Sequence, residues 1–343
     1  MYKGTGISKD QLSDDGEPCI LYGELYTKYK SETIREVISK TNIDNTKLVR
    51  SKANDVIIPC SGETAEDIAT ARCVLNGNIL LGGDLNIIRL HGYDGAFMSY
   101  QLNGRRKYDI AKVAQGVSVV HLYGEHLKGV KTINPCLEEQ KEIAKLLSLL
   151  DERIATQNKI IDKLQSLIKG ISKQLLINNQ NWRTVRIGEF LRIGNGKDYK
   201  HLGIGKIPVY GTGGQMLLVN DYLYDGESVC IGRKGTIDTP MFLKGKFWTV
   251  DTLFYTYDFK DVLPKFCYYL FLQINWKLYN EGTGVPSLSK STIENIKVKI
   301  PSIEQQHNIC SVLDCYEHKT KSEEQILELY LSEKQYLLRQ MFI

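Results

Sequence analysis

The stretch Asn134-Pro135-Cys136-Leu137-Glu138-Glu139-Gln140 has a second copy, Ile300-Pro301-Ser302-Ile303-Glu304-Gln305-Gln306, at an offset of 166 residues (300 minus 134). The same offset pairs further residues on both sides of the motif. Upstream it pairs Gly116 with Gly282, Leu122 with Leu288 and Leu127 with Ile293, and downstream Ile143 with Ile309, Leu147 with Leu313 and Leu164 with Tyr330. Similarity at one fixed period indicates a duplicated structural unit.

A long helical pattern follows each copy of the motif. Its residues recur at alternating steps of four and three, which is the heptad seam of a coiled coil. The first seam holds Ile143, Leu147, Leu150, Ile154, Gln157, Ile161, Leu164, Ile168, Ile171 and Leu175. The second holds Ile309, Leu313, Tyr316, Thr320, Glu323, Leu327, Tyr330, Lys334, Leu337 and Met341. Each seam has a polar residue at the same place, Gln157 and Glu323, and such a residue can fix register at a cost in stability.

Two helices of this kind need a surface that covers their seams. About 40 residues at about 1.5 Å per residue give a helix of about 60 Å, too long for a small domain to cover. We therefore expect the helices over residues 135–178 and 301–343 to pack on each other. Pairing would be antiparallel if the two globular parts lie at opposite ends. Separate bundles and a partner protein are the alternatives.

The rest of the chain, residues 1–134 and 179–300, has a different character. Short runs rich in Val, Ile and Tyr between turns predict strands, for example over 55–59, 228–232 and 248–255, and residues 266–275 predict a short helix. The fold class is therefore α+β, with two mixed domains separated by the long helices. The domains also resemble each other weakly, with 20–23 aligned to 208–211 and 59–64 aligned to 231–236.

Composition limits the function only broadly. The length of 343 residues suits two domains, and 42% hydrophobic residues is ordinary for a globular protein. No apolar run reaches the roughly 20 residues of a membrane helix, so we expect a cytoplasmic protein without a membrane partner. The eight cysteines show no CxxC spacing, and no metal site is expected. Residues 181–301 carry 16 basic and 11 acidic residues, a surplus of 5 that is compatible with a polyanion partner.

No sequence motif for catalysis stands out. The chain has no phosphate-binding loop, no dinucleotide fingerprint and no methyltransferase motif, so we expect no catalytic residues. The loops instead combine hydrogen-bonding, aromatic and basic side chains, which can read base edges or grip phosphates. Taken singly, each is more simply an ordinary surface residue; as groups they are candidates for DNA contact. The candidates are Tyr22, Tyr26, Lys28, Tyr29, Ser61, Glu63, Thr64, Tyr210, Thr212, Gln215, Arg233, Lys234 and Thr236.

Several segments resemble one known family, the specificity subunits of type I restriction-modification enzymes. Residues 6–27, the stretch Ser61-Gly-Glu-Thr-Ala-Glu-Asp-Ile-Ala69 and residues 82–88 are similar to its first target-recognition domain. Residues 135–157 are similar to its central spacer, and 301–306 to the distal copy. One departure is that Trp182–Phe190, a predicted first strand of the second domain, has no counterpart in the first, which puts the completeness of domain 1–134 in question.

The resemblance implies a non-catalytic reader of duplex DNA. Two target-recognition domains would each read half of a split site, and the antiparallel helices would set the gap between the halves. Two modification subunits would dock on the helices and use S-adenosylmethionine, and restriction subunits would use ATP and Mg²⁺. No cofactor is implied for this chain. The alternative is a structural or interaction protein whose main element is the coiled coil.

Overall fold

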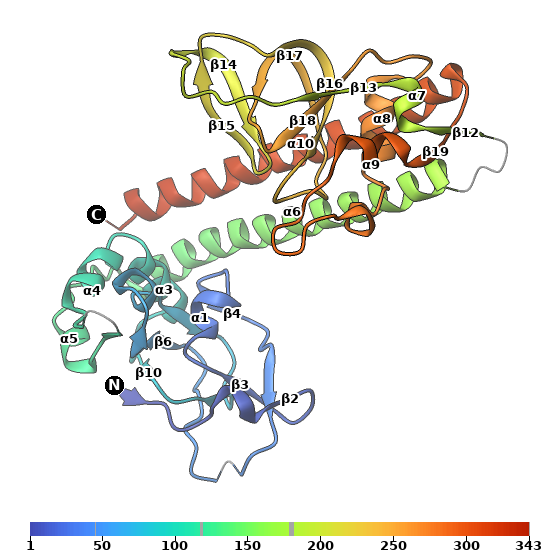
Figure 1. Cartoon of the computed structure of the whole chain (residues 1–343). Coiled ribbons are helices and arrows are strands. Elements are labelled where there is room, and N and C mark those ends of the chain that lie inside the picture. The colour runs from blue at the N-terminus through green and yellow to red at the C-terminus, as the bar shows by residue number, and fades with distance from the viewer. Residues whose placement is uncertain (45, 117–118, 178–181, 343) are drawn as a thin grey trace. The chain divides into compact units, whose positions relative to one another are not determined.

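A computed structural model describes residues 1–44, 46–116, 119–177 and 182–342. These residues fold as two compact units. Unit 1 comprises residues 1–160 and 324–343, and unit 2 comprises residues 161–323. Each unit contains one globular domain and parts of both long helices, α6 (Leu137–Ile177) and α10 (Ile303–Gln340) (Figure 1).

The main sheet of unit 1 has the strand order β1-β10-β6-β8-β4. Its strands are β1 (Tyr2–Lys3), β10 (Leu85–Ile88), β6 (Asp55–Pro59), β8 (Arg72–Val74) and β4 (Thr33–Ile34). A second sheet has the order β2-β5-β3-β9, and a short ladder joins β7 to β11. These strands are β2 (Leu12–Ser13), β5 (Ser39–Thr41), β3 (Glu17–Ile20), β9 (Leu80–Leu81), β7 (Ser61–Gly62) and β11 (Val120–His121). Short helices connect them: η1 (Lys9–Gln11), α1 (Glu24–Thr27), α2 (Ala65–Ile68), α3 (Gly95–Asn103), α4 (Lys107–Val113) and α5 (Gly124–Lys128).

The main sheet of unit 2 has the order β13-β18-β16-β17-β14-β15. Its strands are β13 (Arg192–Asn195), β18 (Leu253–Tyr257), β16 (Tyr224–Gly232), β17 (Met241–Thr249), β14 (Ile204–Gly211) and β15 (Gly214–Val219). A separate antiparallel pair is formed by β12 (Arg183–Arg186) and β19 (Lys297–Ile300). The helices are α7 (Ile187–Phe190), α8 (Pro264–Phe271), η2 (Trp276–Tyr279) and α9 (Lys290–Asn295).

The two main sheets repeat one topology, because the order β1-β10-β6-β8 in unit 1 matches β13-β18-β16-β17 in unit 2. The repeated glycines occupy matching places as well. A Cβ on Gly116 would lie 2.1 Å from the carbonyl oxygen of Val119, and a Cβ on Gly282 would lie 2.1 Å from that of Val285. Both positions therefore require glycine, and the prediction of two mixed domains with long helices is confirmed.

The long helices pair antiparallel within each unit. In unit 1 the beginning of α6 packs against the end of α10 through Ile143, Leu147, Leu337 and Leu338. In unit 2 the end of α6 packs against the beginning of α10 through Ile171, Leu175, Leu176, Ile309 and Leu313. The coiled-coil prediction therefore describes both ends of the helix pair.

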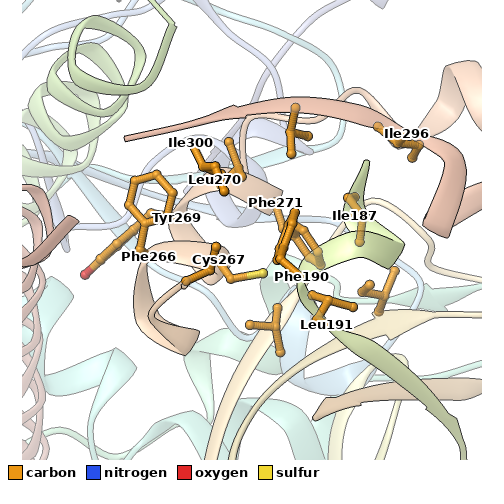
Figure 2. Packing of buried hydrophobic residues seen from close by; sticks show 14 of the residues in the cluster. Ile187, Phe190, Leu191, Phe266, Cys267, Tyr269, Leu270, Phe271, Ile296 and Ile300 are labelled. Atoms are coloured by element: carbon orange, nitrogen blue, oxygen red, sulfur yellow. The ribbon is translucent and has the colours of Figure 1, made fainter. Parts of the chain in front are cut away.

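The largest core lies in unit 2, where α8 packs against the sheet and against α7 (Figure 2). Phe266, Cys267 and Phe271 are fully buried there beside Phe190 of α7. Pro264 begins α8, because a proline in the first turn loses no helical hydrogen bond. This core anchors the strands whose ends form the candidate site below.

Two details differ from the sequence expectations. The predicted strand over 248–255 is interrupted, since β17 ends at Thr249 and β18 begins at Leu253. The Leu253 N–H donates to the Val250 carbonyl at 2.9 Å and closes a turn between the two strands. The strand predicted over Trp182–Phe190 is only half strand, since β12 ends at Arg186 and Ile187–Phe190 form the helix α7. β12 pairs with β19; at the offset of 166, residues 131–134 of unit 1 match β19 but form no strand.

Candidate nucleic-acid interface

In unit 2 the candidate residues cluster at the loop that follows β16. The Arg233 N–H donates to the Thr252 carbonyl at 2.8 Å, and the Gly235 N–H donates to the Pro286 carbonyl at 2.9 Å. Gly235 has φ +96°, a conformation that favours glycine. Neighbouring backbone groups thus make hydrogen bonds with the backbone of this loop, so the side chains of the loop are not needed for that purpose. Arg233, Lys234 and Thr236 are exposed.

The turn of the β14–β15 hairpin lies beside that loop. The Thr212 hydroxyl oxygen would be 3.6 Å from a Cβ on Gly235, so the hairpin turn and the loop are in contact distance. The Tyr210 carbonyl accepts a hydrogen bond from Val250 at 3.0 Å, and Tyr210 pairs with Gln215 across the hairpin. The structure thus brings two sequence-predicted clusters together in unit 2, with Gln215 exposed and Tyr210 half-buried.

In unit 1 the candidate residues Tyr22, Tyr26 and Glu63 also gather. Burial raises the pKa of Tyr26, and the nearby charges of Tyr22, Asp67 and Glu63 raise it further. Thr64 is the N-cap of α2, where its hydroxyl accepts from the Asp67 N–H at 3.1 Å. The Thr64 hydroxyl is therefore engaged in holding the helix.

Three candidates in unit 1 have internal partners. Tyr29 is buried in the core, and its hydroxyl accepts from the Ile38 N–H at 3.3 Å; burial raises the pKa of Tyr29 to about 12. The Lys28 ammonium lies 2.6 Å from the buried Glu24 carboxylate. Ser61 is buried and donates to Asp84 at 3.1 Å. These side chains hold the fold, whereas Tyr22, Tyr26 and Glu63 lie at least partly at the surface.

Hydrogen-bond register shows which loop residues of the two units correspond. The Cys60 carbonyl accepts from Leu122 at 2.8 Å, and the Arg233 carbonyl accepts from Leu288 at 2.9 Å, where 122 and 288 differ by the repeat offset. Cys60 therefore matches Arg233. The sequence alignment of Cys60 with Gly232 is wrong by one residue, because the ladder pairing that sets the register is not local in sequence.

The corrected register changes the comparison of the two loops. Ser61 pairs with His121, and Lys234 bridges to Ser287, so Ser61 matches Lys234. Unit 2 thus presents two basic side chains where unit 1 has a cysteine and a buried serine. Within one scaffold the two units differ in the chemistry of the same loop.

The seam of the long helices is also where the heptads predicted it. All twenty seam positions are buried or half-buried, including the polar Gln157 and Glu323, which are each 7% exposed. Among these buried or half-buried seam residues are Ile143, Leu147, Leu150, Ile154, Gln157, Ile161, Leu164, Ile309, Leu313, Tyr316, Leu327 and Tyr330.

The role of the repeated glutamine in the motif is not apparent from sequence alone. Gln140 accepts from the N–H of Asp94, the N-cap of α3, at 2.9 Å and donates to the Pro135 carbonyl at 2.8 Å. Gln306 accepts from the N–H of Leu263, the N-cap of α8, at 2.8 Å and donates to the Pro301 carbonyl at 3.1 Å. In both units the glutamine ties the start of a long helix to the globular domain. Its repetition at one offset was the available signal.

Comparison with known proteins places this architecture in a family. Residues 3–166 and 179–329 each match the type I restriction modification DNA specificity domain. The chain belongs to this family. It is a specificity subunit of a type I restriction-modification system with two recognition domains.

A relative with the name of a specificity subunit is similar to this chain, and two solved structures share its fold. The chain is 24% identical over 363 residues to the type I restriction enzyme MjaVIII specificity subunit of Methanocaldococcus jannaschii, covering 89% of this chain and 82% of that protein. The crystal structure of a type I restriction-modification S subunit from M. genitalium covers 100% of this chain and 93% of its own, with TM-score 0.68 and 18% identity. A structure from work on assembly and conformational transition of the type I R-M system covers 90% and 86%, with TM-score 0.58 and 14% identity.

Two further observations concern the specificity subunit as a whole. Of the helices that the structure describes, none combines the length and apolarity needed to cross a membrane. Within the described ranges, no three His, Cys, Asp or Glu side chains are grouped so that they could hold a metal ion.

Proposed function

We propose that this subunit reads a duplex DNA site in two parts, one with each recognition domain, and has no catalytic activity of its own. The observation that carries the proposal is one sheet order in both units with different side chains at the same loop. Arg233 and Lys234 stand in unit 2 where Cys60 and Ser61 stand in unit 1. A shared scaffold with different reading residues suits two half-sites of different sequence.

The exposed groups of unit 2 have the chemistry of DNA contact. Arg233 and Lys234 are donors that suit phosphate oxygens and the O6 and N7 acceptors of guanine, and the Gln215 amide suits adenine. Their loop has its backbone hydrogen bonds made by residues 252 and 286–288. These side chains are exposed to a ligand, and binding at Arg233 would compete with the 3.4 Å hydrogen bond that its guanidinium donates to the Asp251 carbonyl.

The helices offer surfaces for partner subunits. One position before the seam, each helix exposes apolar side chains: Leu146, Leu149, Ile160 and Leu167 on α6, and Val312, Ile326 and Leu329 on α10. Leu146 matches Val312 and Ile160 matches Ile326 at the repeat offset of 166 residues. Exposed apolar rows of this kind mark protein interaction sites. A duplicated row supports the binding of two copies of one partner, the modification subunit.

In this proposal the partner subunits carry out the catalytic reactions. Modification subunits would supply S-adenosylmethionine and methyl transfer, and restriction subunits would supply ATP and Mg²⁺ chemistry. The purified chain alone, given S-adenosylmethionine, ATP, Mg²⁺ and duplex DNA, is then expected neither to methylate nor to cleave. Activity of the isolated chain would contradict the non-catalytic assignment.

Selection from a random duplex DNA library, with the chain purified in its native complex, tests the reading function. We expect two short fixed sequences separated by a constant unspecified gap. Deleting a recognition domain would remove one sequence only. Absence of any enrichment would overturn the proposal and favour a structural role for the coiled coil.

A further inference from the structure

Three exposed side chains of unit 1 form a compact cluster beside the β7–β11 ladder. Lys3 lies in β1, His121 ends β11, and Tyr123 is the N-cap of α5. The His121 and Tyr123 rings stack with centroids 6.2 Å apart and an interplanar angle of 25°. The Lys3 ammonium lies 6.0 Å from the centre of the Tyr123 ring. We call this set the Lys3–His121–Tyr123 cluster.

The cluster adjoins the loop that corresponds to the basic loop of unit 2. His121 pairs directly with Ser61, the counterpart of Lys234. Burial raises the pKa of Cys60 to about 11, and the positive charge of Lys3 acts in the opposite direction, as a nearby ammonium would. The cluster therefore borders the two positions where unit 2 places Arg233 and Lys234.

The two units carry their basic and aromatic polar groups at different positions around this loop. At the offset of 166, unit 2 has Ser287 in place of His121 and Ser289 in place of Tyr123. Lys3 pairs with Asn86, the second residue of β10. In unit 2 the second residue of β18 is Phe254, and it pairs with Asn195. Asn195 is therefore the counterpart of Lys3. In unit 2 the basic groups come from the loop after β16, and the positions opposite it bear the neutral residues Asn195, Ser287 and Ser289. In unit 1 the matching loop positions, Cys60 and Ser61, carry no basic group, and the positions opposite them bear the ammonium, the imidazole and the phenol.

The cluster has features of a surface kept for a ligand. Tyr123 is 47% exposed, and Lys3 and His121 are also exposed. Among the residues that the structure describes, no carboxylate forms an ion pair with Lys3. An exposed cation–π contact contributes only about 0.5–1 kcal/mol. Stability therefore gives little reason to gather an ammonium, an imidazole and a phenol at this place.

We propose that the Lys3–His121–Tyr123 cluster is the part of the first recognition domain that contacts DNA, in the role that Arg233 and Lys234 have in the second. This inference rests on the proposed DNA-reading function and names the contact residues of one half. The ammonium, the imidazole N–H and the phenol O–H are all donors, so they match phosphate oxygens and the guanine O6 and N7 acceptors. The ring stack limits the freedom of the donors before binding, which lowers the entropy cost of contact.

The test uses substitutions that unit 2 already carries in the same scaffold. In the variant Lys3→Asn, His121→Ser, Tyr123→Ser, each new residue is the one found at the matching position of unit 2. Lys40→Asn, an exposed lysine of β5, is the control. Both are purified in the native complex and used in library selection and in binding to the wild-type site. Thermal unfolding establishes that each variant is folded. If the triple variant is not folded, the double variant Lys3→Asn with Tyr123→Phe replaces it.

For the triple variant we expect at least about a fivefold weaker binding of the wild-type site, which is one lost contact of about 1 kcal/mol or more. The selected half-site of domain 1 should degrade, while the other half-site and the gap persist. Lys3→Asn alone should reduce the salt slope of binding by about one if Lys3 grips a phosphate. Wild-type affinity and both half-sites retained in the triple variant would overturn the inference. Failure of the wild-type complex to select any split site would instead refute the proposed function.

Discussion

Lys334 of α10 and Asp151 of α6 form a 2.6 Å ion pair in the interior of unit 1. Lys334 also pairs with Glu32 of the recognition domain. Asp151 accepts hydrogen bonds from Tyr100 of α3 and from Ser31, each at 2.7 Å. One cation at a seam position thus joins both long helices to the domain that they carry. This network is a candidate for fixing the register of the helices in unit 1.

Removing the cation should therefore be costly. In Lys334→Met the carboxylates of Glu32 and Asp151 would remain close together and mostly buried, and breaking a buried pair in this way costs about 3–5 kcal/mol of unfolding free energy. Denaturant unfolding measures the loss. Adding Glu32→Gln and Asp151→Asn to Lys334→Met removes the stranded charges and should recover most of it. A single variant within about 0.5 kcal/mol of wild type would contradict the role of the network.

The same network predicts a loss of stability in alkali. Burial acts to lower the pKa of Lys334, but the carboxylates of Glu32 and Asp151 outweigh it, and the pKa lies above its ordinary 10.5. A raised lysine pKa gives stability that is complete below about pH 10.5 and is lost as pH rises through the folded-state pKa. Above pH 10.5 the wild type should lose up to about 1.4 kcal/mol per pH unit more than Lys334→Met. Equal slopes for the two proteins would refute this coupling.

The glutamine of the repeated motif gives a prediction in each unit. Gln306→Ala leaves the N–H of Leu263 without its acceptor near the start of α8, and Gln140→Ala does the same to Asp94. A buried donor without a partner costs about 1–3 kcal/mol. The exposed neighbour Gln305→Ala is the matched control and should change stability by less than about 0.5 kcal/mol. Hydrogen exchange at residues 263 and 94 should rise in the respective variants; unchanged protection would count against the contact.

What the sequence predicted well is local. The heptad seam was predictable because a helix places residues three and four apart on one face, and every seam position is at least half-buried. What it missed depends on pairing between distant segments. The one-residue error at Cys60 came from strand register, and Tyr29 is buried by contacts with segments that no local pattern reveals. The seam pattern places Lys334 but does not reveal its ion pairs, because its carboxylate partners lie on other elements.

Arg233 and Lys234 allow a direct test of the second half-site. Arg233→Ala with Lys234→Ala should weaken DNA binding by the native complex and blur only the half-site of domain 2. Each lost phosphate contact reduces the slope of log K against log salt by about 0.9. Lys169→Ala with Lys321→Ala, at exposed lysines of α6 and α10 in the same unit, removes the same two charges and is the control. A variant pair with the slope and sequence preference of wild type would show that this loop does not touch DNA.

The exposed apolar rows predict that glutamate substitutions in the part of the rows that lies in unit 1 release one modification subunit. Leu149 and Leu329 lie in unit 1, 49% and 69% exposed, and Leu149 shares a cleft with Tyr330. A buried carboxylate in a subunit interface costs several kcal/mol, so Leu149→Glu with Leu329→Glu should release one modification subunit and leave the one bound through unit 2. Native mass spectrometry counts the subunits. Ile204→Glu with Leu278→Glu, at residues of β14 and η2 that are 98% and 77% exposed, is the matched control and should leave both bound. If the double variant keeps both modification subunits, this row of α6 and α10 is not their docking surface.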